Sequence, residues 1–193
     1  MRILLANQRP FRGAERGLPF AELDSALAAA GHQVRRLAVG SPDSEVQLSD
    51  QELTAYRDVL RQALDAEIDA FDPHIVHAQP IGILAHLALE AGVAYLLTAS
   101  GMELPVDRLD PRLQRFTVQA AENASRIVAV SDAVRAAMIA AFGDLDGRII
   151  TMAPALAAPE LAFTAETQAE AALWLTQLYR QVLTDRFGFC PEG

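Results

Sequence analysis

Three arginines stand close together near the start of the chain, at Arg9, Arg12 and Arg16, and Gly13 lies among them. Guanidinium groups bind phosphate and carboxylate through charge-assisted hydrogen bonds. The chain as a whole is acidic, with a formal net charge of -9, so this cationic stretch differs from its surroundings. We therefore expect an anion-binding loop here, with phosphate or a phosphorylated molecule as the ligand. A solvated surface loop is the alternative.

A second set of polar residues follows two apolar runs later in the chain. His77 lies at the end of one run, and Ser100 and Glu103 follow the next. Imidazole can exchange a proton near neutral pH, and a hydroxyl can donate or accept a hydrogen bond. These three are candidates for catalysis, but the catalytic residue itself stays unassigned. The alternatives are a structural, hydrogen-bonded histidine for His77 and a solvated carboxylate for Glu103.

Gly101 and Asp107 belong to the same stretch as Ser100. A glycine lets a ligand approach the backbone closely, so Gly101 is a candidate binding residue; the alternative is that it only permits a turn. The carboxylate of Asp107 could bind hydroxyl groups, with surface solvation as the alternative.

Several other chemistries lack their motifs. Ser100 is not part of a G-x-S-x-G elbow, which argues against a hydrolase triad. Neither a G-x-G-x-x-G nor a G-x-x-x-x-G-K-[ST] loop occurs, which weakens dinucleotide and ATP binding. The histidines lack metal-ligand spacing with carboxylates, and the single Cys190 excludes an internal disulfide or a cysteine metal cluster. We expect no metal and no resident cofactor.

Short apolar runs that alternate with helical stretches are expected to position these residues. Runs rich in Val, Ile and Leu without strict alternation indicate strands buried on both faces. The pattern predicts an α/β fold with a doubly wound parallel sheet. Strands are expected near 2–6, 33–39, 74–78, 94–98, 126–130 and 148–152. Helices are expected near 19–30, 50–70, 81–91, 110–123, 132–142 and 165–187.

Local signals support several of these boundaries. Ser49 and Glu52 stand at capping-box spacing before the second helix, and Pro73 follows its end. Gly31 is a favourable stop for the first helix, and Ser131 is placed to cap the helix at 132–142.

The last part of the chain separates from the first 154 residues. We expect a domain over 1–154, a linker over 155–164 and a terminal helix over 165–187. The helix carries an apolar stripe at helical spacing, which needs a partner surface. The stripe consists of Ala171, Leu175, Leu178, Tyr179 and Val182. The domain of the same chain could provide the surface, or two copies could exchange helices as a homodimer.

Five segments occur in an order typical of one family. They are MRILLAN at the start, FDPHIVHAQ, LLTASGMEL, ASRIVAVSDAVRAAM, and LYRQVL near residue 180. Together they resemble the amino-terminal, acceptor-side domain of family 4 glycosyltransferases, the retaining GT-B enzymes. LYRQVL is similar to the family's last helix, which packs back on the first domain. The resemblance implies a Rossmann-like domain with this helix, and no donor-binding domain between them.

The resemblance also implies a function and roles for the loops. It implies the acceptor-side half of a nucleotide-sugar-dependent retaining glycosyltransferase that needs a separate donor-binding subunit. Gly13 matches the family glycine that approaches the donor diphosphate. Ligands of open α/β sheets sit beyond the carboxyl ends of the strands, where the loops 7–17, 77–82 and 98–104 are expected to meet.

The sequence departs from the family pattern at the site. Arg12 replaces the first of the family's paired glycines, Ser100 replaces a histidine, and Gln79 replaces the second histidine of the HAH motif. The segment leading to the donor domain reads MAPALA instead of IPNGVD. These departures leave open a catalytically inactive binding or regulatory subunit. An enzyme of another class on the same scaffold is a third alternative.

Composition limits partners and location. The acidic charge argues against nucleic-acid and anionic-membrane surfaces. No apolar run approaches the roughly 20 residues that cross a bilayer, and the single cysteine is typical of a reducing compartment. We expect a cytoplasmic protein without a membrane span.

Overall fold

A computed structural model describes residues 1–7, 23–40, 48–101, 104, 110–152 and 165–188, with only the backbone of 165 and 166. Its core is a single sheet of six strands in the order β2-β1-β3-β4-β5-β6, and all neighbouring pairs are parallel. The strands are β1 Arg2–Asn7, β2 Gln33–Ala38, β3 Ile75–Gln79, β4 Tyr95–Ala99, β5 Ile127–Ala129 and β6 Ile149–Thr151. The predicted α/β fold with a doubly wound parallel sheet is confirmed.

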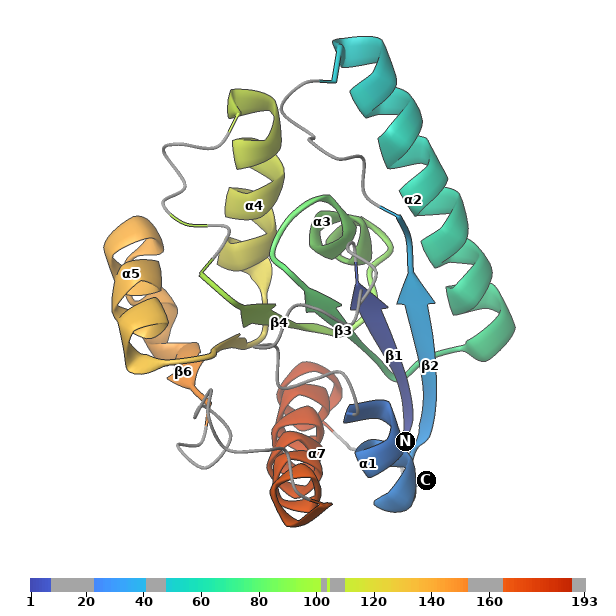
Figure 1. Cartoon of the computed structure of the whole chain (residues 1–193), viewed down its shortest axis with the longest axis vertical. Coiled ribbons are helices and arrows are strands. Elements are labelled where there is room, and N and C mark those ends of the chain that lie inside the picture. Colours follow the sequence, from blue (N-terminus) through green and yellow to red (C-terminus); the bar gives the residue numbers. More distant parts are fainter. Residues whose placement is uncertain (8–22, 41–47, 102–103, 105–109, 153–164, 189–193) are drawn as a thin grey trace.

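The helices follow the strands in the predicted alternation. They are α1 Leu23–Ala29, α2 Asp50–Phe71, α3 Ile83–Glu90, α4 Pro111–Asn123, α5 Asp132–Phe142, the short 3-10 helix η3 Leu145–Gly147, and α7 Ala165–Phe187. Helices α2, α3 and α4 cover one face of the sheet, and α1 and α7 cover the other (Figure 1). Helix α5 lies beside β5 and β6.

The helix boundaries have local causes. The capping box of α2 forms as predicted: the Glu52 backbone N–H donates to Ser49 Oγ at 3.3 Å, and the Ser49 backbone N–H donates to the Glu52 carboxylate at 2.8 Å. The helix ends at Phe71 and is capped by Asp72, which has a left-handed φ of 47° and precedes Pro73. Ser131 caps α5 by accepting from the Val134 N–H at 3.2 Å.

Alternate residues of each central strand enter two separate cores. In β1, Leu4 and Ala6 face α2, α3 and α4, whereas Ile3 and Leu5 face α1 and α7. Strands buried on both faces carry apolar residues at almost every position, which is why the sequence shows continuous runs here.

Helix α7 packs on the domain of its own chain. The five residues of the predicted stripe are all buried in the core beneath α1 and α7. The last turns of α7 lie near the amino ends of β4 and β5. There Arg126 pairs with Asp185 at 2.9 Å, and Arg186 donates to the backbone oxygen of Gly92 at 2.7 Å. The predicted packing of the terminal helix is therefore confirmed.

Candidate functional site

The strand order reverses between β1 and β3, because β2 lies on one side of β1 and β3 on the other. Crevices at such reversals, beyond the carboxyl ends of the strands, are where open α/β sheets bind ligands. The last residues of the two strands, Asn7 and Gln79, are direct cross-strand partners. Both carry uncharged amide side chains, and each is only 8% exposed. We take this end of the sheet as the candidate site.

The side chain of Gln79 is unusual within this site. Its Oε1 is buried and has no hydrogen-bond partner among the described residues. Buried polar atoms in folded proteins almost always have a hydrogen-bond partner, so an unpaired oxygen at the end of the sheet where ligands are expected requires an explanation. The sequence placed Asn7 and Gln79 within the loops 7–17 and 77–82 that were expected to meet at the ligand site, but it assigned neither residue a binding role. A polar residue at the end of an apolar strand was the available signal.

His77 lies two residues before Gln79, on the face of the sheet that α7 covers. It is fully buried, and its Nδ1 and Nε2 lie 2.7 Å from Tyr179 Oη and from Thr98 Oγ1, respectively. Burial lowers the pKa of His77 to about 3, so the ring is neutral at physiological pH. Both nitrogens hold β3 to β4 and α7. This geometry supports the structural alternative for His77 and gives no support to proton exchange in a cleft.

Ser100 and Gly101 follow β4 at the same edge. Ser100 is half-buried. Gly101 has a φ of 92°, and a Cβ there would lie 3.1 Å from Val134 Cγ2 of α5. Its carbonyl accepts a hydrogen bond from the Leu104 N–H at 3.2 Å. These contacts support the turn alternative for Gly101, because both the positive φ and the tight approach to α5 favour glycine.

The remaining candidates lie outside the described residues. They are the cationic set Arg9, Arg12, Gly13 and Arg16, and the carboxylates Glu103 and Asp107. Anion binding by the first set and hydroxyl binding by the second stay predictions. The expected linker at 155–164 and Cys190 also lie outside.

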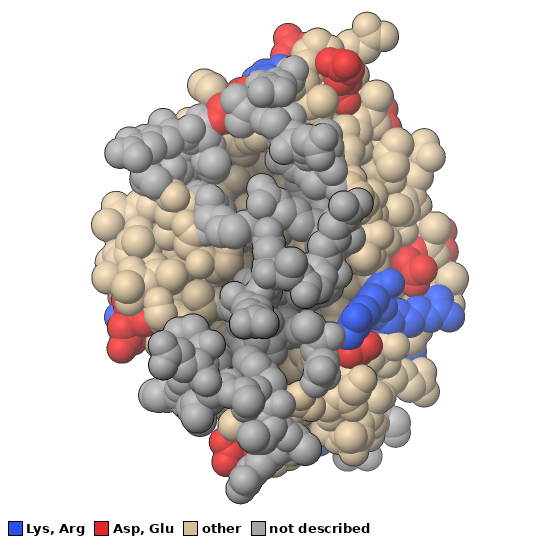
Figure 2. Space-filling model, in the orientation of Figure 1, with Lys and Arg blue, Asp and Glu red and all other residues tan. Residues whose placement is uncertain are grey.

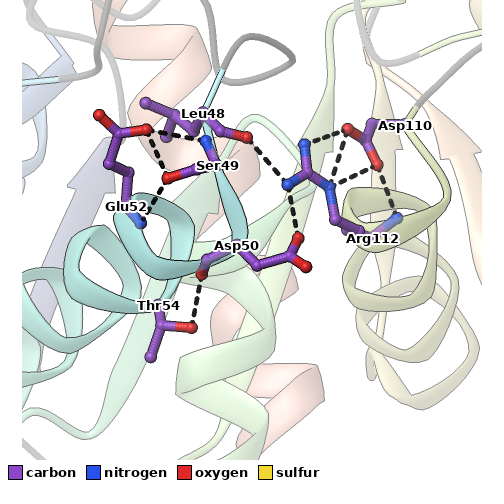
Figure 3. A network of polar contacts seen from close by, with 7 residues as sticks. All are labelled: Leu48, Ser49, Asp50, Glu52, Thr54, Asp110 and Arg112. Carbon is purple, nitrogen blue, oxygen red and sulfur yellow. Dashed lines mark hydrogen bonds and ion pairs between the residues drawn. The ribbon is translucent and has the colours of Figure 1, made fainter.

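Arg112 links two helices at the rim of this edge (Figure 3). Its Nε and Nη2 donate to Asp110 at 3.0 and 2.6 Å, and its Nη1 donates to Asp50 at 2.8 Å and to the backbone oxygen of Leu48 at 2.9 Å. The hydrogen bonds from Arg112 lower the pKa of Asp110. The amino ends of α2 and α4 are thereby tied together. This link could not be predicted from the sequence, since Arg112 and Asp50 are far apart along the chain.

Several basic side chains elsewhere among the described residues are paired with acidic ones. Figure 2 shows a group of basic side chains with acidic ones beside it, in the region of β2. On β2, Arg35 lies 3.4 Å from the Glu67 carboxylate, and Arg36 pairs with Asp24. Exposed pairs of this kind add little stability, and they neutralise the charge that a phosphate would need. The described part of β2 is therefore a poor anion site.

Comparisons with family models and solved structures identify the relatives of this chain. The profile of Glycosyltransferase Family 4 matches residues 20–155. The chain belongs to glycosyltransferase family 4. The match includes β2 to β6 and the loops at their carboxyl ends, so the family assignment rests on the domain that forms the candidate site. No curated protein matches the sequence.

Solved structures with the same fold include a sucrose-phosphate synthase of Thermosynechococcus elongatus. It is 16% identical, with a TM-score of 0.61, and the match covers 94% of this chain and 99% of that one.

The UDP-GlcNAc 2-epimerases of Methanocaldococcus jannaschii and Neisseria meningitidis also match. They are 11% and 12% identical, with TM-scores of 0.56 and 0.53, and the second is bound to UDP-GlcNAc. The matches cover 81% and 96% of this chain but only 46% and 52% of the epimerase chains. At these identities the likeness concerns the fold alone.

Two further properties, membrane-spanning helices and metal-binding groups, concern the part of the chain that the structure describes. None of its helices is long and apolar enough to cross a membrane. No group of three or more histidine, cysteine, aspartate or glutamate side chains in it could hold a metal ion.

Proposed function

We propose that this chain is the acceptor-side half of a nucleotide-sugar-dependent retaining glycosyltransferase, that a separate donor-binding subunit completes the enzyme, and that the chain itself contributes the loop that contacts the donor diphosphate. One observation carries the proposal. Helix α7 packs directly on the domain, and only residues 152–164 lie between β6 and α7. In the family pattern, the donor-binding domain occupies that interval. Thirteen residues cannot hold a domain with its own core, since single domains rarely fall below about 40 residues.

The similar sucrose-phosphate synthase structure supports this architecture. The two chains have nearly the same extent, because the match covers 94% of this chain and 99% of that one.

The carboxyl ends of the strands would receive the ligands. We assign the diphosphate to Arg12 and Gly13. The guanidinium group of Arg12 attracts an anion, and Gly13 has no side chain that would keep a ligand from the backbone. Ser100 and Glu103 would lie near sugar hydroxyls. His77 would act through position only, because it fixes β3 and β4 at the point where their loops begin. Transfer itself needs both halves, since the reaction takes place between them.

Thermal unfolding with nucleotide ligands tests this function. UDP-GlcNAc or UDP at 100 times its Kd should stabilise the chain by about 2.7 kcal/mol, which corresponds to a Tm increase of about 5–10 °C for a chain of this size. Arg12→Ala should abolish the increase. Arg180→Ala, on an exposed position of α7, should keep it. If neither a nucleotide nor a nucleotide sugar raises the Tm, the transferase proposal is wrong.

A catalytically inactive binding or regulatory subunit is the second candidate. Two observations favour it: Ser100 replaces the family histidine, and the kept His77 is fully buried between β4 and α7. Such a subunit would take the place of an amino-terminal domain in a complex with a glycosyltransferase. Sugar transfer by the purified chain alone would eliminate this candidate.

A further inference from the structure

The side chain of Gln79 lies where a ligand is expected, and the described residues leave its amide oxygen without a hydrogen-bond donor. Gln79 ends β3 at the reversal of strand order, opposite Asn7. Its Oε1 is buried without a hydrogen-bond partner among the described residues, although the residue is 8% exposed and so borders the surface.

The neighbouring polar residue on the same strand shows that the fold can satisfy buried groups. His77 lies on the same face of β3, and both of its ring nitrogens are paired at 2.7 Å. A buried oxygen that has lost its water and gained no donor opposes folding. An apolar side chain of the same shape would avoid this penalty. The presence of an amide at this position is explained if its oxygen has a partner in the bound state.

The described polar side chains beside the amide carry no charge, and this limits the kind of partner that the oxygen can bind. Asn7 and Gln79 are uncharged, and burial keeps His77 neutral. An amide oxygen accepts a hydrogen bond but cannot neutralise a phosphate. A neutral hydrogen-bond donor is therefore the complementary partner, and a sugar ring carries several such donors in its hydroxyl groups.

We propose that Gln79 accepts a hydrogen bond from a sugar hydroxyl of the bound ligand and so distinguishes a sugar-bearing ligand from the bare nucleotide. This proposal rests on the proposed function and adds a residue that determines specificity within it. The oxygen is enclosed in the unbound protein, so binding turns the side chain toward the edge of the sheet. Glutamine can do this through its three rotatable bonds without movement of β3.

Calorimetry with two ligands and two matched variants tests the proposal. Gln79→Met keeps the length of the side chain and removes the amide. Gln119→Met removes an amide whose oxygen is already paired, at 2.7 Å from His86 Nε2. Wild type and both variants are titrated with UDP-GlcNAc and with UDP, and their Tm values are measured without ligand.

We expect Gln79→Met to bind UDP with the wild-type Kd and UDP-GlcNAc about tenfold more weakly, the effect of one lost hydrogen bond. Its Tm should equal that of wild type or rise by about 2–4 °C, because a buried unpaired oxygen is gone. Gln119→Met should unfold at a lower temperature, since it leaves His86 without its partner, and should bind both ligands as wild type does.

A further variant keeps the test decisive if Gln79→Met does not fold. Gln79→Glu retains an acceptor oxygen at the same reach. The ratio of its UDP Kd to its UDP-GlcNAc Kd should stay within about threefold of the wild-type ratio, even if its charge weakens both.

Two results overturn the inference and leave the proposed function standing. One is a ratio of the UDP Kd to the UDP-GlcNAc Kd that is the same in Gln79→Met as in the wild type. The other is a Tm several degrees below that of wild type in this variant, which would show that the amide is paired and structural. If wild type binds neither UDP-GlcNAc nor UDP, the proposed function fails, and the inference fails with it.

Discussion

The face of the sheet under α1 and α7 and the face under α2, α3 and α4 bury their polar groups differently. Under α7, two histidines form polar contacts with this helix. His77 bonds to Tyr179 and to Thr98 of β4, and His32 bonds to Thr176 at 2.7 Å. On the opposite face, the buried hydroxyl of Tyr95 donates to a backbone oxygen of α4 at 2.9 Å. The charged pairs lie nearer the surface.

The charged pairs of the second face join neighbouring helices. Arg57 of α2 donates to the Glu90 carboxylate of α3 at 2.7 and 2.6 Å, and Arg112 of α4 reaches Asp50 of α2. The comparison indicates that the buried contacts of α7 include two histidines with lowered pKa values, His77 and His32, whereas charged pairs join the helices of the other face.

The largest expected effect comes from Tyr179, at the centre of the α7 contact. Tyr179→Ala removes a fully buried ring and its bond to His77, and should lower the free energy of unfolding by about 3–5 kcal/mol. Urea unfolding followed by circular dichroism measures this. Tyr179→Phe removes the hydroxyl alone and should cost about 1–3 kcal/mol. A loss below about 1 kcal/mol in the alanine variant would contradict a structural role for α7 in this domain.

The dependence of stability on pH should distinguish the two faces. Burial holds the folded-state pKa of His77 near 3, below the ordinary value of 6.5. Below pH 6.5 the unfolded chain therefore binds a proton that the folded chain does not, and stability falls as the pH falls. Between pH 7 and 5 the loss from His77 alone should be about 2 kcal/mol.

Burial also lowers the pKa values of His32 and His74, so both add to the loss in the same direction. His77→Gln should flatten the pH dependence, while Tyr95→Phe on the other face should leave its slope unchanged. Equal slopes in wild type and His77→Gln would show that His77 is not a buried neutral group.

A smaller effect is expected at the carboxyl edge, where β4 meets α5. Gly101→Ala must adopt a positive φ and place its Cβ 3.1 Å from Val134, so it should cost about 1–2 kcal/mol. Gly92→Ala is the matched control, because Gly92 also has a positive φ but faces open space. Unfolding in urea should show a greater loss for Gly101→Ala. The reverse order would mean that the contact with α5 is loose.

The smallest effect concerns the start of α2. Ser49→Ala removes the capping oxygen and should cost about 1 kcal/mol. Thr54→Ala, on an exposed position of the same helix, should change stability by less than about 0.5 kcal/mol. Both values can be read from urea unfolding midpoints. Equal losses would show that the capping box contributes nothing beyond helix propensity.

The sequence predicted the elements better than the site. Buried strands and the stripe on α7 follow from residue periodicity, which survives in the folded protein because each apolar run faces a core. Periodicity does not tell which core a residue of a doubly buried strand faces. It therefore left His77 between two roles, which its contacts with Thr98 and Tyr179 separate.

Long-range polar contacts were beyond the reach of the sequence. Arg112 meets Asp50 across a separation of 62 residues, and Gln79 meets Asn7 only because β1 and β3 are neighbours in the sheet. Strand order sets both, and the sequence gives order along the chain alone. The arginines at 9, 12 and 16 stay a prediction from composition.

Hydrogen exchange with bound UDP-GlcNAc tests the central claim most directly, namely that the reversal between β1 and β3 is the ligand site of this glycosyltransferase family 4 domain. The ligand should slow amide exchange at the carboxyl ends of β1 and β3 and at the start of α3, and leave the last turns of α7 unchanged. Slower exchange confined to the amino ends of the strands or to α7, or none anywhere, would contradict the account.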